Sequence, residues 1–151
     1  MRPARWVSAC VFLLALYPLV ASGQDKAAKE DQFDPDKMTG TWTYVSGVKN
    51  GEKVDPDHFK DSKVSITKDT MTLEGPAGKF VLEYKLDAKK KPVTISMKMT
   101  EGAGEGATAE GIVKVKGDEL TICYAREGDG PKTFEAKEGS NFHLFVLKRS
   151  K

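Results

Sequence analysis

From residue 41 onward, apolar and polar side chains alternate along the chain with a period of two. In KFVLEYKLD (79–87), for example, Phe80, Leu82 and Tyr84 fall on one face, and charged residues dominate the other. Such alternation is typical of β-strands that bury one side. It predicts about eight strands, at residues 41–48, 63–68, 70–74, 79–87, 92–99, 110–116, 119–125 and 142–149.

Turn-forming residues separate the predicted strands. They include Lys68-Asp69, Gly75-Pro76, the lysine run before Pro92, and Gly117-Asp118. This spacing favours an all-β, antiparallel up-and-down sheet, closed as a barrel or folded as a sandwich. Asp55-Pro56 combines a helix cap with a proline at the first helical position, so one short helix is expected to link the first two strands. A long loop at 126–141 is expected before the last strand.

The first 23 residues have the features of a secretory signal peptide. A basic segment precedes an apolar run at residues 6–20, and Ala21-Ser22-Gly23 supplies small residues before a cleavage point at Gln24. The apolar run is shorter than the roughly 20 residues of a membrane-spanning helix. We therefore expect an exported protein, periplasmic or secreted, with no integral membrane segment in its mature chain.

The mature chain is expected to contain one folded domain. Residues 24–37 are charged and predict a flexible N-terminal tail, whose end (Asp34-Pro35) resembles a capped helical turn. The barrel domain would then occupy residues 38–151. A chain of this length can bury enough apolar surface to fold without disulfides or metal ions.

Charge and cysteine content exclude several classes of function. Loss of the signal peptide removes two arginines and no acidic residue, which leaves 22 basic residues against 22 acidic ones. This balance gives no basic patch for nucleic acid. Cys123 is the one cysteine of the predicted mature chain, so no intrachain disulfide is expected.

A glycine and a tryptophan in the first strand and a basic residue in the last one indicate how the barrel would close. Gly40-Thr41-Trp42 opens the first strand, and a basic residue ends the last one. This combination resembles lipocalin-like barrels, which implies that Trp42 plugs the closed end of the barrel beneath a cationic side chain. The cation would be Arg149, or Lys148 if the side chains of the last strand alternate in the opposite sense. A guanidinium over an indole contributes roughly 0.5–2 kcal/mol.

Further short blocks narrow this resemblance. They are YKLDAKKKP (84–92), GDELTICYA (117–125), PKTFEA (131–136) and LFVLKR (144–149). In this order and spacing, the blocks resemble a domain family of unknown function from planctomycetes and related bacteria. The resemblance covers residues 38–149 and implies a lipocalin-like fold without an assigned activity. Val113 stands where the family pattern leads us to expect an aromatic residue, which would soften or enlarge the interior.

No arrangement of residues in the sequence predicts catalysis. Cys123 lies within a strand and faces away from Ile122 and Tyr124, which indicates a buried, unreactive thiol. His58 and His143 lie far apart, and their spacing fits no metal site. The glycine-rich stretch at 101–111 joins two strands and lacks the Lys-Ser/Thr ending of a phosphate-binding loop. We therefore expect no enzyme, no cofactor and no metal.

The predicted interior leaves two interpretations open. If Trp42 points inward, it shares its side with a set of candidate ligand-binding residues: Tyr44, Phe80, Leu82, Tyr84, Ile95, Met97, Ile122 and Tyr124. These would bind a small hydrophobic molecule in a monomeric barrel. Alternatively, the side chains fill the barrel, which then acts as an interaction or envelope-associated module. The short strands favour the filled barrel, whereas a cavity of about 300 Å³ or more would favour binding.

Overall fold

A computed structural model of the chain describes residues 32–151. The predicted signal peptide (1–23) and the predicted tail up to residue 31 lie outside the described residues. Residues 32–151 form one compact unit. Within it, the side chain of Phe33 packs against the hydrophobic core.

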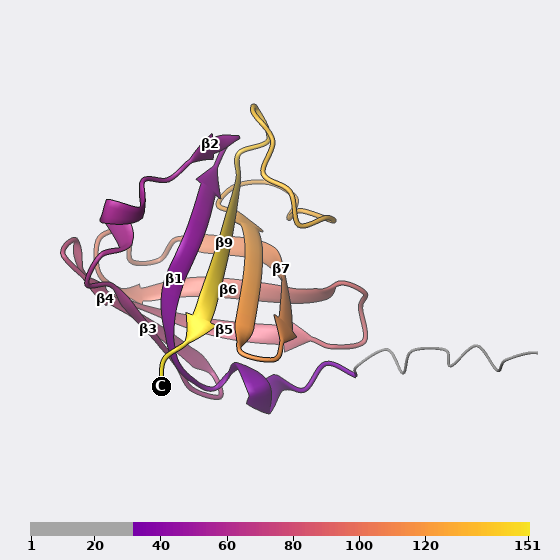
Figure 1. Cartoon of the computed structure of the whole chain (residues 1–151). Coiled ribbons are helices and arrows are strands. Elements are labelled where there is room, and N and C mark those ends of the chain that lie inside the picture. Colours follow the sequence, from indigo (N-terminus) through magenta and orange to yellow (C-terminus); the bar gives the residue numbers. More distant parts are fainter. Residues whose placement is uncertain (1–31) are drawn as a thin grey trace, which may run out of the picture. The chain divides into compact units, whose positions relative to one another are not determined.

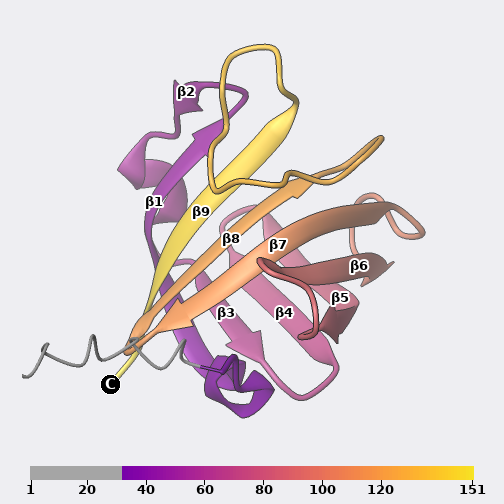
Figure 2. The same ribbon diagram turned by 90° about the vertical axis from the view of Figure 1, so that its right-hand side faces the viewer.

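The domain is an all-β structure closed by antiparallel pairing (Figures 1 and 2). In order, its strands are β1 (Gly40–Lys49), β2 (Glu52–Lys53), β3 (Lys63–Ile66), β4 (Thr70–Gly75), β5 (Gly78–Asp87), β6 (Val93–Glu101), β7 (Thr108–Lys116), β8 (Glu119–Ala125) and β9 (Phe142–Arg149). Each strand from β3 to β8 pairs with the next one along the chain, and β1 pairs with both β3 and β9. The predicted eight-stranded up-and-down barrel is therefore confirmed, and the short β2 is an addition at its edge.

Two short 3₁₀ helices form at the predicted cap-and-proline sites. η1 (Pro35–Met38) begins after Asp34, whose side chain accepts a hydrogen bond from the Asp36 backbone amide. η2 (Pro56–Phe59) begins after Asp55 in the same way. In both helices, proline supplies a pre-set φ angle and lacks an amide that would otherwise need a partner. No helix within residues 32–151 has the length and apolarity that crossing a bilayer requires.

The first strand differs from the predicted alternation at Val45. A β-bulge between Tyr44 and Ser46 leaves Val45 exposed. The side chains after the bulge therefore point to the opposite side of the sheet from the one that the alternation predicts. The alternation predicted Ser46 on the side of Trp42, but Gly47 is the residue that is buried there. A bulge adds one residue to one strand, so the pattern of a single strand does not reveal it.

The two ends of the barrel differ. At one end, here called the base, Trp42 is fully buried and its Nε1 donates to the Met38 carbonyl of η1. At the other end, here called the mouth, lie η2, the β4–β5 turn and the β6–β7 loop. A long segment at residues 126–141, here called the strap, leaves β8 at the mouth end and returns to β9 (Figure 2).

Candidate functional site

The barrel holds a cavity of about 550 Å³, which is open to solvent at the mouth. This volume lies within the range of small-molecule binding pockets. Its walls are predominantly apolar and come from β1, β3–β9, η2 and the loops at the mouth. Of the two interpretations that the sequence left open, the cavity favours an interior with room for a ligand over a filled one.

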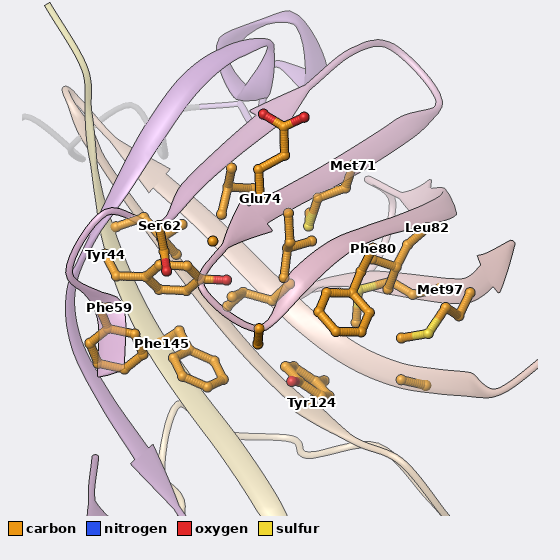
Figure 3. Close-up of a pocket in the computed structure, with 18 of the residues that line it drawn as sticks. Tyr44, Phe59, Ser62, Met71, Glu74, Phe80, Leu82, Met97, Tyr124 and Phe145 are labelled. Carbon is orange, nitrogen blue, oxygen red and sulfur yellow. The ribbon is translucent and has the colours of Figure 1, made fainter. Parts of the chain in front are cut away.

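One wall of the cavity is aromatic. Tyr44 stacks on Phe59 of η2 with a centroid distance of 4.9 Å, and Phe145 of β9 meets both rings edge-on at 5.6 and 5.9 Å (Figure 3). Gly47 allows this cluster to form, because a Cβ at that position would lie 2.7 Å from both the Phe59 and the Phe145 rings. The bulge at Val45 is what turns Gly47 toward these rings.

The opposite wall combines one aromatic ring with flexible and branched apolar side chains. Phe80, Leu82 and Met97 lie across the cavity from the aromatic cluster (Figure 3). The mouth is bordered by the β4–β5 turn (Gly75–Gly78) and by alanines of the β6–β7 loop. Methionine adapts to different shapes, so this wall suits an apolar ligand without demanding a single outline.

Two tyrosine hydroxyls give the cavity polar character. Tyr44 and Tyr124 both line it, and neither hydroxyl forms a hydrogen bond with another residue of the 32–151 unit. Burial raises the pKa of both phenols, and proximity to Tyr124 raises that of Tyr44 further. Both groups therefore stay protonated and can donate a hydrogen bond to an acceptor in the cavity.

The structure brings most of the predicted ligand-binding residues to this cavity. Six of the eight line it: Tyr44, Phe80, Leu82, Met97, Ile122 and Tyr124. Tyr84 and Ile95 belong to the buried core and are not among the lining residues. Tyr84 instead donates a 2.6 Å hydrogen bond to the Thr67 carbonyl in the β3–β4 turn, so it serves the base.

The base has the predicted arrangement of tryptophan and cation. The Arg149 guanidinium lies 4.3 Å from the centroid of the Trp42 ring, and the two residues are paired between β1 and β9. Gly40 has a φ of +127°, and a Cβ there would lie 2.8 Å from Nη1 of Arg149. Glycine therefore makes room for the guanidinium.

Cys123 is fully buried on the outer side of the sheet. Its Sγ lies 3.7 Å from the Glu135 carbonyl of the strap, and Ala136 of the strap is buried as well. Burial raises the pKa of the thiol to about 11, which keeps it protonated and unreactive near neutral pH. Within residues 32–151, no three histidine, cysteine or acidic side chains gather as metal ligands would.

Sequence reasoning missed several residues of the cavity. Phe59 and Phe145 form much of the aromatic wall, while Lys49 and Arg126 line the cavity near its mouth. Phe59 is the one aromatic residue of the Asp55-Pro56 helical turn, which was a signal that the turn packs inward. For Lys49 and Arg126, the sequence shows only charged residues at strand ends, which is typical of solvated positions as well.

Comparisons with known proteins add no relative. The chain matches no protein-family model, and neither curated proteins nor solved structures show a significant match to it. The class that the structure itself defines is a closed eight-stranded antiparallel β-barrel with an internal cavity. The resemblance to a planctomycete domain family stays a prediction from the sequence.

Proposed function

We propose that this protein is a binding protein that holds a small, mainly apolar molecule inside its barrel. The observation that carries the proposal is the cavity of about 550 Å³, whose walls are predominantly apolar and whose two tyrosine hydroxyls form no hydrogen bond with another described residue. Burial of apolar ligand surface supplies roughly 25 cal/mol per Å² of driving force. Unpartnered hydroxyls add orientation.

We also propose that the protein works outside the cytoplasm as a non-enzymatic module. The support is the basic start, apolar run and small-residue ending of residues 1–23. Expression in a bacterial host, followed by N-terminal sequencing of the exported product, tests this proposal. A mature chain that starts at Gln24 is the expected result, and an uncleaved chain retained in the cytoplasm would contradict it.

The alternative function, an interaction module with a filled barrel, rested on an interior without free space. The cavity speaks against that premise. A protein-binding surface usually presents a contiguous apolar patch. Among the described residues, Val45 is the one large hydrophobic side chain that is strongly exposed. We therefore retain ligand binding as the proposed function.

Binding is tested with the full chain and N-phenyl-1-naphthylamine, an uncharged dye that fluoresces in apolar sites. We expect a saturable fluorescence increase with one site per chain. Ala109 lines the cavity beside Met97, so Ala109→Trp should fill the space and abolish the increase. Val45→Trp, at the exposed bulge, adds the same side chain outside the cavity and should bind normally.

Circular dichroism melts establish that both variants are folded. Dye binding that is absent from the wild type, or that is equal in the wild type and a folded Ala109→Trp variant, would contradict binding in the barrel. Competition by unlabelled apolar molecules then identifies the ligand class.

A further inference from the structure

Three polar side chains form a row across adjacent strands on the inner side of the barrel. Lys49 of β1 is in register with His143 of β9, and His143 is in register with Tyr124 of β8. The His143 and Tyr124 rings stack with centroids 5.1 Å apart and planes 8° apart. Arg126 follows two residues after Tyr124, and both Lys49 and Arg126 line the cavity. We call these four residues the polar row.

The polar row lies on the mouth side of two apolar layers. The next inward pair on β8 and β9 is Ile122 with Phe145, and the pair below it is Leu120 with Leu147. All four of these side chains are buried. The cavity therefore changes from apolar in its depth to cationic at the edge formed by β1, β8 and β9.

The two cations of this edge have no acidic partner among the residues that the structure describes. Neither Lys49 nor Arg126 forms an ion pair within the described unit, and Lys49 Nζ lies 5.9 Å from the Phe145 centroid. Asp57, His58 and Glu74 also line the cavity, from η2 and the end of β4. The Glu74 carboxylate points away from the aromatic cluster (Figure 3), whereas Asp57 belongs to η2, the helix whose Phe59 stacks on Tyr44 of β1.

His143 lies at the same edge, beside Tyr124. Its Nδ1 is buried and has no hydrogen-bond partner among the described residues. Burial lowers the pKa of His143, and the nearby charges of Arg126 and Lys49 lower it further. Two cationic side chains thus lie near an unpartnered nitrogen and near the Tyr124 hydroxyl, which has no hydrogen-bond partner among the described residues.

We propose that the ligand is an amphiphile with a single anionic group, which sits at the mouth between Lys49 and Arg126 while its apolar body fills the cavity. This inference rests on the proposed function and adds the ligand's class and orientation. A charge buried in the apolar depth would lose its hydration without compensation. At the polar row it meets two cations and a phenol donor, and charge-assisted hydrogen bonds are the strong ones.

Three probes that share a hydrocarbon chain and differ in the head group test the proposal. Dodecanoate, 1-dodecanol and dodecyltrimethylammonium each compete with bound N-phenyl-1-naphthylamine on the full chain, at low salt and below their micelle concentrations. We expect dodecanoate to bind about tenfold more tightly than the alcohol. The ammonium compound should bind most weakly, and added salt should reduce the preference for the carboxylate.

A double variant assigns the preference to the polar row. Lys49→Met/Arg126→Met keeps the apolar stems, so it should bind dodecanol as the wild type does and dodecanoate no better than dodecanol. Lys85→Met/Lys98→Met is the matched control, because both lysines are exposed on β5 and β6. It should retain the full preference for dodecanoate.

The orientation of the bound ligand is tested separately by the NMR signals of the His143 ring. Dodecanoate should raise the pKa of His143 by offsetting the charges of Lys49 and Arg126, and dodecanol should not. Equal affinity for the three probes, or an equal effect of both ligands on His143, would overturn the anionic head group while leaving the proposed function intact. If no probe displaces the dye, the proposed function itself fails. If the double variant does not fold, the order of affinities of the three probes for the wild type still tests the anionic head group.

Discussion

The guanidinium of Arg149 lies 4.3 Å from the centroid of the Trp42 ring, where the last strand of the barrel meets the first. The same group donates to the carbonyls of Thr39 at 2.8 Å and Lys37 at 2.6 Å. One side chain therefore joins η1, β1 and β9 at the base. Its further contact with Asp118, at 3.7 Å, involves an exposed carboxylate and contributes little.

The contacts of Arg149 predict a large effect on stability. Arg149→Met should lower the free energy of unfolding by about 2–4 kcal/mol, because it removes a cation–π contact and two charge-assisted hydrogen bonds. Urea denaturation followed by circular dichroism measures the change. Lys148→Met is the control, since Lys148 is exposed and should change stability by less than about 0.5 kcal/mol. Similar losses in the two variants would contradict the role of Arg149.

Two tyrosines inside the barrel should respond differently to the loss of a hydroxyl. Tyr84→Phe removes the 2.6 Å hydrogen bond to the Thr67 carbonyl and should lower the free energy of unfolding by about 1 kcal/mol. Tyr44 has no such partner within residues 32–151, so Tyr44→Phe should leave stability unchanged or slightly increased. Thermal unfolding of the two variants provides a direct comparison. A larger loss for Tyr44→Phe than for Tyr84→Phe would show that the assignment is wrong.

Cys123 should be protected by the strap. With a thiol pKa of about 11 and no exposure, Cys123 should react slowly with iodoacetamide in the native protein and rapidly in urea. Ala136→Asp places a carboxylate at a buried strap position and should speed the native reaction by about tenfold or more, because burying the charge favours the open strap. Peptide mapping by mass spectrometry follows Cys123 separately from Cys10.

The control for the strap is Thr133→Asp, which adds the same charge at an exposed position. It should keep the slow reaction of the wild type. If Ala136→Asp reacts no faster than Thr133→Asp, the strap is not what shields the thiol.

His143 should make the domain less stable in acid. Its pKa in the folded protein is lowered below the ordinary value of 6.5, so the unfolded chain takes up the proton first as the pH falls. Its stabilising contribution is present above 6.5 and is lost as the pH falls below it. His143→Phe keeps a ring against Tyr124 and should show a shallower fall of melting temperature between about pH 8 and pH 5. Parallel curves for the wild type and the variant would contradict this prediction.

Much of the fold was predictable because the side of the sheet to which a side chain points follows from its position within its own strand. Neighbouring residues of a strand point to opposite sides, so the runs that contain Phe80, Leu82 and Met97 identify their inner faces without knowledge of the partner strands. Asp34-Pro35 and Asp55-Pro56 predicted both short helices for the same local reason. The resemblance to lipocalin-like barrels implied that a cation of the last strand covers Trp42, and the register of β1 with β9 assigns this role to Arg149 and not to Lys148.

The candidate site was less predictable because it depends on contacts between distant segments. The bulge at Val45 arises where β1 fits against β9, and it brings Gly47 rather than Ser46 to face Phe145. Tyr84 and Ile95 share the inner side with the lining residues but lie below the cavity, a level that alternation does not encode. Likewise, only the register of β1, β9 and β8 places Lys49, His143 and Tyr124 in one row.

By itself, the sequence determined that the chain forms a meander of short strands with a tryptophan at its start and a cation at its end, because these features follow from the conformational preferences of neighbouring residues. Only the tertiary structure decided that the interior keeps a cavity of about 550 Å³ with cations on one side of its mouth. The volume left inside a barrel depends on how all eight strands tilt and shift against one another. No single segment of the chain carries that information.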